Sequence, residues 1–179
     1  MKNINDYIIE KFKLNKDNVT KIIVVKSKEE LLEIIGDRFK WEDKVIDFND
    51  LDVSNIKDMS NIFADKDFIN IDISGWDVSN VKTMRGMFNN CKHLRSTGDL
   101  SSWDVSNVID MSFIFNNCEY LKNIGDLKDW EINGTKMAYA FQDCKQLKTI
   151  GDIYNWKPKE ANWEIFPLCD LKPMPKNRV

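Results

Sequence analysis

The sequence predicts a right-handed α/β solenoid of about five strand–turn–helix units, with a helix–strand–helix cap at its N-terminus. Two observations predict this fold class. The segment Asp52–Met59 returns with few changes at 77–84 and 104–111, at spacings of 25 and 27 residues. A methionine and a phenylalanine four residues apart also recur in each unit, and this separation is typical of one helical face. The two columns are Met59, Met84, Met111 and Met137, and Phe63, Phe88, Phe115, Phe141 and Phe166.

Each unit is expected to begin with a short strand and to continue into a short helix. Alternating apolar residues at 97–100, 124–127 and 150–153 indicate the strands. One unit has apolar side chains on only one face, so neighbouring units must stack to close a core. The expected helix N-caps are Ser54, Ser79 and Ser106. The predicted boundaries are a cap at 1–44, units near 45–70, 71–96, 97–123, 124–149 and 150–171, and a tail at 172–179.

The cap is predicted from three local patterns. Apolar residues at helical spacing in Asn5–Leu14 indicate a first helix, and β-branched residues in Val19–Lys26 indicate a strand. Ser27 and Glu30 form a capping box ahead of a second apolar helix.

Composition and charge give few clues to a partner. The 179 residues are 42% hydrophobic and 31% charged, with a net charge of -3, so no overall basic field attracts nucleic acid or an anionic membrane. No secretory signal or membrane-spanning apolar stretch is visible. We therefore expect a cytoplasmic protein that binds another protein, with no membrane contact and no direct nucleic-acid binding.

The cysteines recur once per unit, at spacings of 27, 26 and 25 residues, without a close pair. This pattern favours small apolar core thiols over a metal site or disulfides, and a metal or redox role is the alternative. We predict no metal and no cofactor. The column is Cys91, Cys118, Cys144 and Cys169.

A tryptophan column and an aspartate column are the candidate binding residues. The tryptophans close the predicted strands, where they either roof the core or anchor a partner. The aspartates are expected to point outward, and like charges on successive strands destabilise the sheet unless something offsets them. Bonds to their own turns, an acidic protein-binding strip, and calcium binding or phosphate mimicry are the alternatives. The predicted partner-binding residues are Asp72, Asp99, Asp126, Asp152, Ser74, Ser101, Trp76, Trp103 and Trp130.

No catalytic residues are predicted. The sequence contains no phosphate-binding glycine loop, nucleophile elbow or zinc-protease motif. The single histidine, His93, has no paired nucleophile or ligand motif, so it receives no role.

The units share a Trp-Asp-Val-Ser-Asn step at 76–80 and 103–107 and a Phe-Asn-Asn-Cys step at 88–91 and 115–118. In these steps the chain resembles the BspA-like leucine-rich-repeat family of bacterial surface proteins. The resemblance implies a leucine-rich-repeat-like solenoid, and it supplies no catalytic residue.

The predicted function is a non-catalytic protein-binding module. One form that suits this size is a phage or mobile-element inhibitor that occludes a host protein. Two alternatives stay open: a fragment of a cell-surface adhesin, and an acidic nucleic-acid mimic that blocks a nucleic-acid-binding enzyme.

Overall fold

The computed structural model describes residues 22–39, 45–159 and 165. Within these residues, α2 (Lys28–Phe39) is an α-helix and η2 (Leu127–Asp129) is a 3₁₀ helix. The strands are β1 (Ile23–Val24), β2 (Ile46–Asp47), β3 (Leu51–Asp52) and β4 (Ile71–Asp72). β1 pairs with β3 and β2 pairs with β4, in both cases in parallel.

These elements contradict the predicted α/β solenoid of five strand–turn–helix units. Each of the two sheets has two strands of two residues, and most of the described chain consists of turns and coil. No helix begins at Ser54, Ser79 or Ser106, and the residues that follow them form turns. The leucine-rich-repeat-like fold class is therefore wrong for this chain.

The segment 84–91 shows why a methionine and a phenylalanine four residues apart do not mark a helix here. Gly86 and Asn90 have φ of 61° and 62°, a left-handed conformation that a right-handed helix does not contain. The N–H of Met87 donates to the Met84 carbonyl and closes a turn. Positive φ recurs at the two matching positions of the other sequence repeats, at Asn61, Asp65, Phe113, Asn117, Tyr139 and Asp143.

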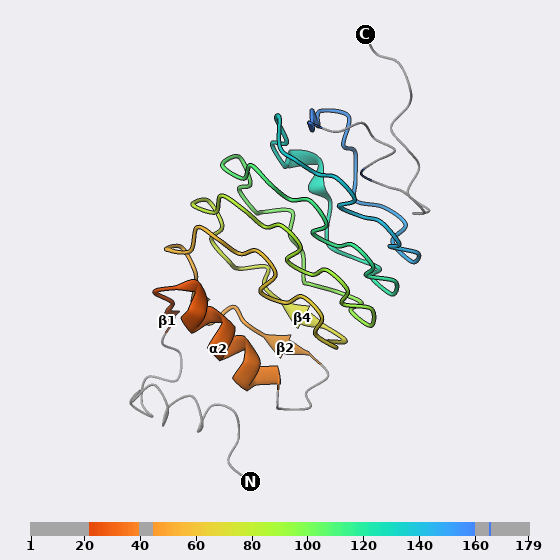
Figure 1. Cartoon of the computed structure of the whole chain (residues 1–179). Coiled ribbons are helices and arrows are strands. Elements are labelled where there is room, and N and C mark those ends of the chain that lie inside the picture. The colour runs from red at the N-terminus through yellow and green to blue at the C-terminus, as the bar shows by residue number, and fades with distance from the viewer. Residues whose placement is uncertain (1–21, 40–44, 160–164, 166–179) are drawn as a thin grey trace.

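Backbone hydrogen bonds join each segment to the one about a repeat further along the chain. The N–H of Phe63 donates to the Met87 carbonyl at 3.0 Å, and the N–H of Phe88 donates to the Ile114 carbonyl at 2.8 Å. Isolated parallel bridges continue this pairing along positions 58, 83, 110 and 136. Figure 1 shows the resulting coils of chain lying side by side, beginning next to α2.

Polar side chains close the corners of these coils. The carboxylate of Asp72 accepts the N–H of Ser74 at 3.0 Å, and that of Asp104 accepts the N–H of Ser106 at 3.0 Å. This is the Asx-turn geometry. The side chain of the residue two positions before the donor takes the place of a backbone carbonyl as the acceptor. The same bond joins Asp47 to Asn49, Asp52 to Ser54, Asp58 to Ser60, Asp77 to Ser79, Asp99 to Ser101, Asp110 to Ser112, Asp126 to Lys128 and Asp152 to Tyr154.

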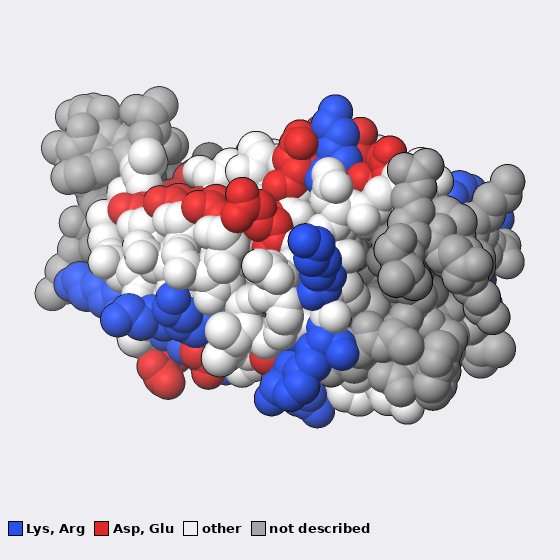
Figure 2. Space-filling view, turned by 90° about the horizontal axis from the view of Figure 1, so that it is seen from above, with Lys and Arg blue, Asp and Glu red and all other residues white. Residues whose placement is uncertain are grey.

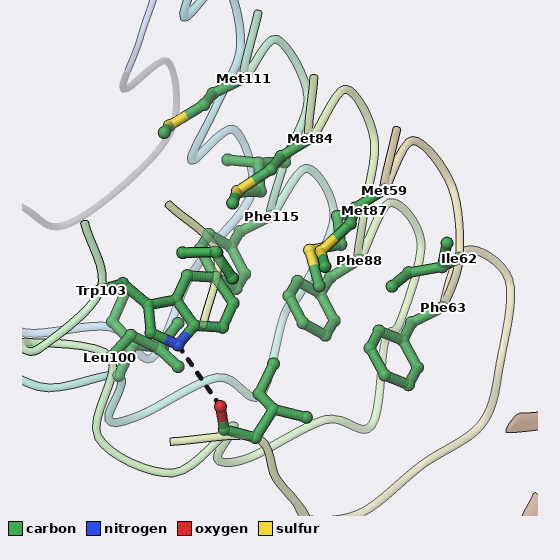
Figure 3. Close-up of a cluster of buried hydrophobic side chains, with 14 of the residues drawn as sticks. Met59, Ile62, Phe63, Met84, Met87, Phe88, Leu100, Trp103, Met111 and Phe115 are labelled. Carbon is green, nitrogen blue, oxygen red and sulfur yellow. Dashed lines mark hydrogen bonds between the residues drawn. The ribbon is translucent and has the colours of Figure 1, made fainter. Parts of the chain in front are cut away.

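The core is built from ladders of like side chains (Figure 3). The Phe63 and Phe88 rings stack with centroids 5.1 Å apart, and Phe88 and Phe115 repeat that distance with ring planes only 1° apart. The methionine column lies beside them and is buried. Every described member of the two columns is buried, and Phe166 lies outside the described residues.

The described part of the predicted cap is a strand followed by a helix that packs on the first coil. One half of the predicted capping box is confirmed, because Ser27 Oγ accepts the Glu30 N–H at 3.2 Å. Glu30 Oε2 accepts the N–H of Lys26 at 2.8 Å, one residue before the N-cap N–H that the box predicts. At the other end of α2, the buried Arg38 donates two hydrogen bonds to the Asp50 carboxylate, at 2.6 and 2.7 Å. This pair fixes α2 to the first coil.

The strand predicted within Val19–Lys26 is represented by β1. The helix predicted at Asn5–Leu14 and the tail at 172–179 lie outside the described residues. Of the fifth unit, residues 150–159 and 165 are described. The predicted domain boundaries stay predictions.

We predict that Phe115→Ala lowers the free energy of unfolding by about 3–5 kcal/mol, because it leaves a cavity in the middle of the phenylalanine ladder. Urea denaturation checks this value. Tyr154→Ala is the control: the Tyr154 side chain is 67% exposed, and its removal should change stability little. Equal losses in both variants would contradict the ladder as a source of stability.

We also predict opposite effects for two glycine-to-alanine substitutions. Gly125 has φ of 93°, and a Cβ there would lie 2.0 Å from Asp99 Oδ1, so Gly125→Ala should destabilise the chain by about 1–3 kcal/mol. Gly36 lies within α2 with nothing within 4 Å of an added Cβ, so Gly36→Ala should stabilise by about 0.5–1 kcal/mol. Thermal melting of the two variants gives the signs, and a stabilised Gly125→Ala would refute the close approach of Asp99.

Candidate interaction surface

Acidic residues are concentrated in the segments that contain one set of turns, in which an aspartate accepts the N–H two residues later. These turns are closed by Asp47, Asp72, Asp99, Asp126 and Asp152. We call this set the acidic edge and define it by segments 47–52, 72–77, 99–104, 126–131 and 152–157. These segments contain eleven acidic residues and only two basic ones, Lys128 and Lys157. The acidic members are Asp47, Asp50, Asp52, Asp72, Asp77, Asp99, Asp104, Asp126, Asp129, Glu131 and Asp152. Figure 2 shows a row of acidic side chains on one face, with a basic side chain among the acidic ones near one end and further basic side chains elsewhere on that face.

Hydrogen bonds from the turns lower the pKa of several of these carboxyls. For Asp104, the Ser106 hydroxyl at 2.6 Å and then the Ser106 N–H lower the pKa of the carboxyl. For Asp72, desolvation acts to raise the pKa, but the hydroxyl and N–H of Ser74 outweigh it, so the net shift is downward. The lowered pKa values of Asp72 and Asp104 therefore favour the charged form of these two carboxyls.

The structure brings the predicted aspartates and serines together on this edge. Asp99, Asp126 and Asp152 are exposed, and Asp72, Ser74 and Ser101 are half-buried. Each of these aspartates bonds its own turn, which was one of the alternatives for this column. That bond fixes the direction of the carboxylate and leaves its charge on the surface.

The predicted tryptophans do not belong to this surface. Trp76, Trp103 and Trp130 are only 2–3% exposed, and the rings of Trp103 and Trp130 stack 6.3 Å apart. The indole N–H of Trp103 donates to the Ile73 carbonyl of the previous coil (dashed in Figure 3). Trp76 and Trp130 make the same bond to Phe48 and Leu100. A partner cannot reach rings in this position, so their assignment as binding anchors is corrected to core residues.

The described cysteines are also core residues, as predicted. Each thiol donates to a carbonyl of the previous coil, for example Cys118 to Phe88 at 3.1 Å. Burial raises the pKa of the Cys91 thiol to about 12. Cys169 lies outside the described residues, and within those residues no group of three or more His, Cys, Asp or Glu side chains could hold a metal ion.

Sequence reasoning missed two further surface features. His93, which received no role, contacts Asp67, and both line a hollow of about 380 Å³ together with Ile69, Arg95 and Tyr120.

The second missed feature is a pair of aromatic residues, Phe113 and Tyr139, at positions of positive φ. Alignment of the repeats gave a signal for it, because the same column begins with the turn formers Asn61 and Gly86.

Across the part of the chain that is described, no helix is long and apolar enough to cross a membrane.

The structure defines a turn-rich protein whose parallel coils display a charged edge. The chain belongs to the DUF285 family, described as Mycoplasma proteins of unknown function, whose model matches residues 34–156. No curated protein and no solved structure matches the chain. The family description names neither a fold nor an activity, so the resemblance to the BspA-like family stays a prediction.

We predict that Ser106→Ala raises the pKa of Asp104 toward the ordinary aspartate value, because the variant removes the strongest hydrogen bond to the carboxylate. Carboxyl NMR titration measures this pKa. Ser102→Ala is the matched control, since the Ser102 hydroxyl bonds the Ser74 carbonyl and not Asp104.

The sign of the stability effect follows from the lowered pKa. A carboxyl whose pKa is lower in the folded chain stabilises it above the unfolded-chain pKa, and that stabilisation is lost as pH falls through the folded pKa. The stability difference between the wild type and Ser106→Ala should therefore narrow on acidification. A difference that stays constant with pH would contradict the ionised Asp104–Ser106 bond.

Proposed function

We propose that this chain is a non-catalytic protein-binding module, and that its acidic edge docks on a basic surface of a partner protein and occludes it. One observation carries the proposal: five stacked turn segments hold eleven acidic residues, of which Asp50 pairs with Arg38, against two lysines. The net charge of the whole chain is only -3, so this edge is far more negative than the rest of the molecule. Such a local field attracts and orients a basic partner.

The need to close turns does not account for the charge. At another corner of the coils, neutral side chains make the same bond: Ser96 Oγ accepts the Gly98 N–H at 3.2 Å, and Asn123 Oδ1 accepts the Gly125 N–H at 3.0 Å. Stacking in register places like side chains near each other, so uncharged residues would close the acidic edge at a lower electrostatic cost. The aspartates therefore favour a role outside the fold.

The edge is also suited to binding because its side chains are held in place. Asp72 and Asp104 each accept two hydrogen bonds from one serine, so their carboxylates have little freedom to lose when a partner binds. Because neighbouring segments are hydrogen-bonded to one another, the carboxylates form an ordered array. Occlusion then follows from the extent of this array, without any chemical step.

The test uses aspartate-to-asparagine substitutions, because asparagine keeps the Oδ1 acceptor for the turn and removes the charge. The neutralised variant carries Asp77→Asn, Asp99→Asn, Asp104→Asn and Asp126→Asn. The control changes the net charge equally in other segments, with Asp65→Asn, Asp67→Asn, Glu119→Gln and Asp143→Asn. Both variants should melt close to the wild type, which separates loss of binding from loss of fold.

We expect the wild type and the control to capture the same basic protein from lysate of the native cell, and the neutralised variant to lose it. With the purified partner, association should slow by about tenfold in the neutralised variant and become less sensitive to salt. A partner that binds the neutralised and wild-type chains alike would refute the proposal. If nucleic acid displaces the chain from a captured nucleic-acid-binding enzyme, the occlusion takes the form of phosphate mimicry. The expected cytoplasmic location stays a prediction.

A further inference from the structure

A row of three side chains from successive coils lies outside the acidic edge. Arg85 lies over the Phe113 ring, with the guanidinium carbon 4.9 Å from the centroid, and the Phe113 and Tyr139 rings stack 5.3 Å apart. We call Arg85, Phe113 and Tyr139 the aromatic ridge. Arg85 and Tyr139 are exposed, and Phe113 is half-buried.

The backbone conformation of the ridge is unfavourable for its own residues. Phe113 and Tyr139 have φ of 61° and 57°, a left-handed region that is an outlier for bulky side chains. Asn61 and Gly86 occupy the same column and φ region in the preceding coils, and they are among the residues that adopt it most readily. The fold therefore does not need aromatic rings at this position, and strain of this kind is typical of functional surfaces.

The geometry limits what can bind the ridge. One face of Phe113 is covered by Arg85 and the other by Tyr139, so neither face is open for a flat ligand to stack on. The ridge therefore presents the edge of the Phe113 ring, the exposed Tyr139 ring and the guanidinium group. Arginine, tyrosine and phenylalanine are enriched in protein interfaces, and preformed stacks of this kind lose little freedom on binding.

The charges around the ridge indicate the chemistry of the partner. The neighbouring columns at 57–61, 82–86, 109–113 and 136–139 carry four basic residues and two acidic ones. Asp58 is paired with Lys28 at 3.0 Å, and Asp110 lies 3.9 Å from Arg85. Ile109, which is 66% exposed, lies in the same column as Lys57 and Lys82. The surroundings are thus basic with exposed apolar side chains.

The geometry points to the aromatic ridge as a second docking surface, which binds an acidic segment of a partner protein that also carries apolar side chains. Carboxylates of that segment pair with Arg85 and the nearby lysines, and its apolar side chains pack on the edges of Phe113 and Tyr139. This surface shares no residue with the acidic edge and has the opposite charge. The inference can therefore hold or fail independently of the proposed function.

The test selects short random peptides, displayed on phage, on the immobilised full-length chain, and measures selected peptides by fluorescence anisotropy. The ridge variant carries Phe113→Asn and Tyr139→Asn, which place a residue suited to positive φ at both sites. The matched control carries Ile69→Ser and Tyr120→Ser, which remove two exposed apolar side chains from the separate hollow.

We expect the selected peptides to combine Asp or Glu with aromatic or aliphatic residues. Their affinity should fall by about tenfold or more in the ridge variant and in Arg85→Ser, and stay unchanged in the control. The melting temperature of the ridge variant should equal or exceed that of the wild type, because asparagine relieves the strained backbone.

Several results would overturn the inference. Selected peptides without acidic residues, or with equal affinity for the ridge variant, would remove the docking surface. A lowered melting temperature in the ridge variant would make the aromatic pair structural. Ridge-dependent binding of labelled oligothymidine would assign the surface to nucleic acid, and ridge-dependent self-association in sedimentation velocity would assign it to a second copy of the chain.

Discussion

The backbone hydrogen bonds between successive coils are the interaction on which the rest of this molecule depends. A chain with few regular elements must still pair its buried N–H and C=O groups. Here some N–H groups donate to a carbonyl of the following coil, and others donate to a carbonyl of their own turn. The N–H of Phe88 donates to the Ile114 carbonyl in the following coil, whereas the N–H of Cys91 closes a turn onto Phe88 itself. The bonds between coils run in parallel, so each residue lies beside the residue one repeat later. This register determines which side chains meet.

The register has opposite consequences for apolar and charged residues. The register stabilises the apolar columns, because like rings stack, as in the Phe63–Phe88–Phe115 ladder with its 5.1 Å spacings. It destabilises the charged columns, because it brings like charges together. The aspartates offset part of that loss through bonds to their own turns, which lower the pKa of Asp104 and of Asp72. An acidic edge can therefore persist in a folded chain, although the fold itself does not require charge there.

The sequence was sufficient to predict the columns but not the conformation between them. Recurrence identifies Phe88, Met84 and Cys91 as members of columns, all of them buried, and the local Ser27–Glu30 pattern identifies Ser27 as the N-cap of α2. The helices were wrong because a spacing of four residues also fits two consecutive turns, and φ at Gly86 or Tyr139 cannot be read from residue spacing. Burial of Trp103 depends on the carbonyl of Ile73 in another coil, and the attachment of α2 depends on the pair Arg38–Asp50. Both are tertiary contacts that no local pattern reports.

The acidic edge and the aromatic ridge differ in their relation to stability. An aspartate at a corner supplies a turn bond as well as a charge, so the fold benefits from the acceptor and only the charge is additional. The rings of Phe113 and Tyr139 supply no acceptor to their own turns, and φ values of 61° and 57° disfavour these residues relative to Asn61 and Gly86 in the same column. The Arg85 contact with Phe113 and the stacking of the two rings offset part of this cost, and an exposed cation–π contact contributes only about 0.5–1 kcal/mol. We infer that contact of the rings and the guanidinium group with a partner offsets the remaining cost. The inferred docking surface at the ridge therefore rests on the backbone conformation as well as on exposure.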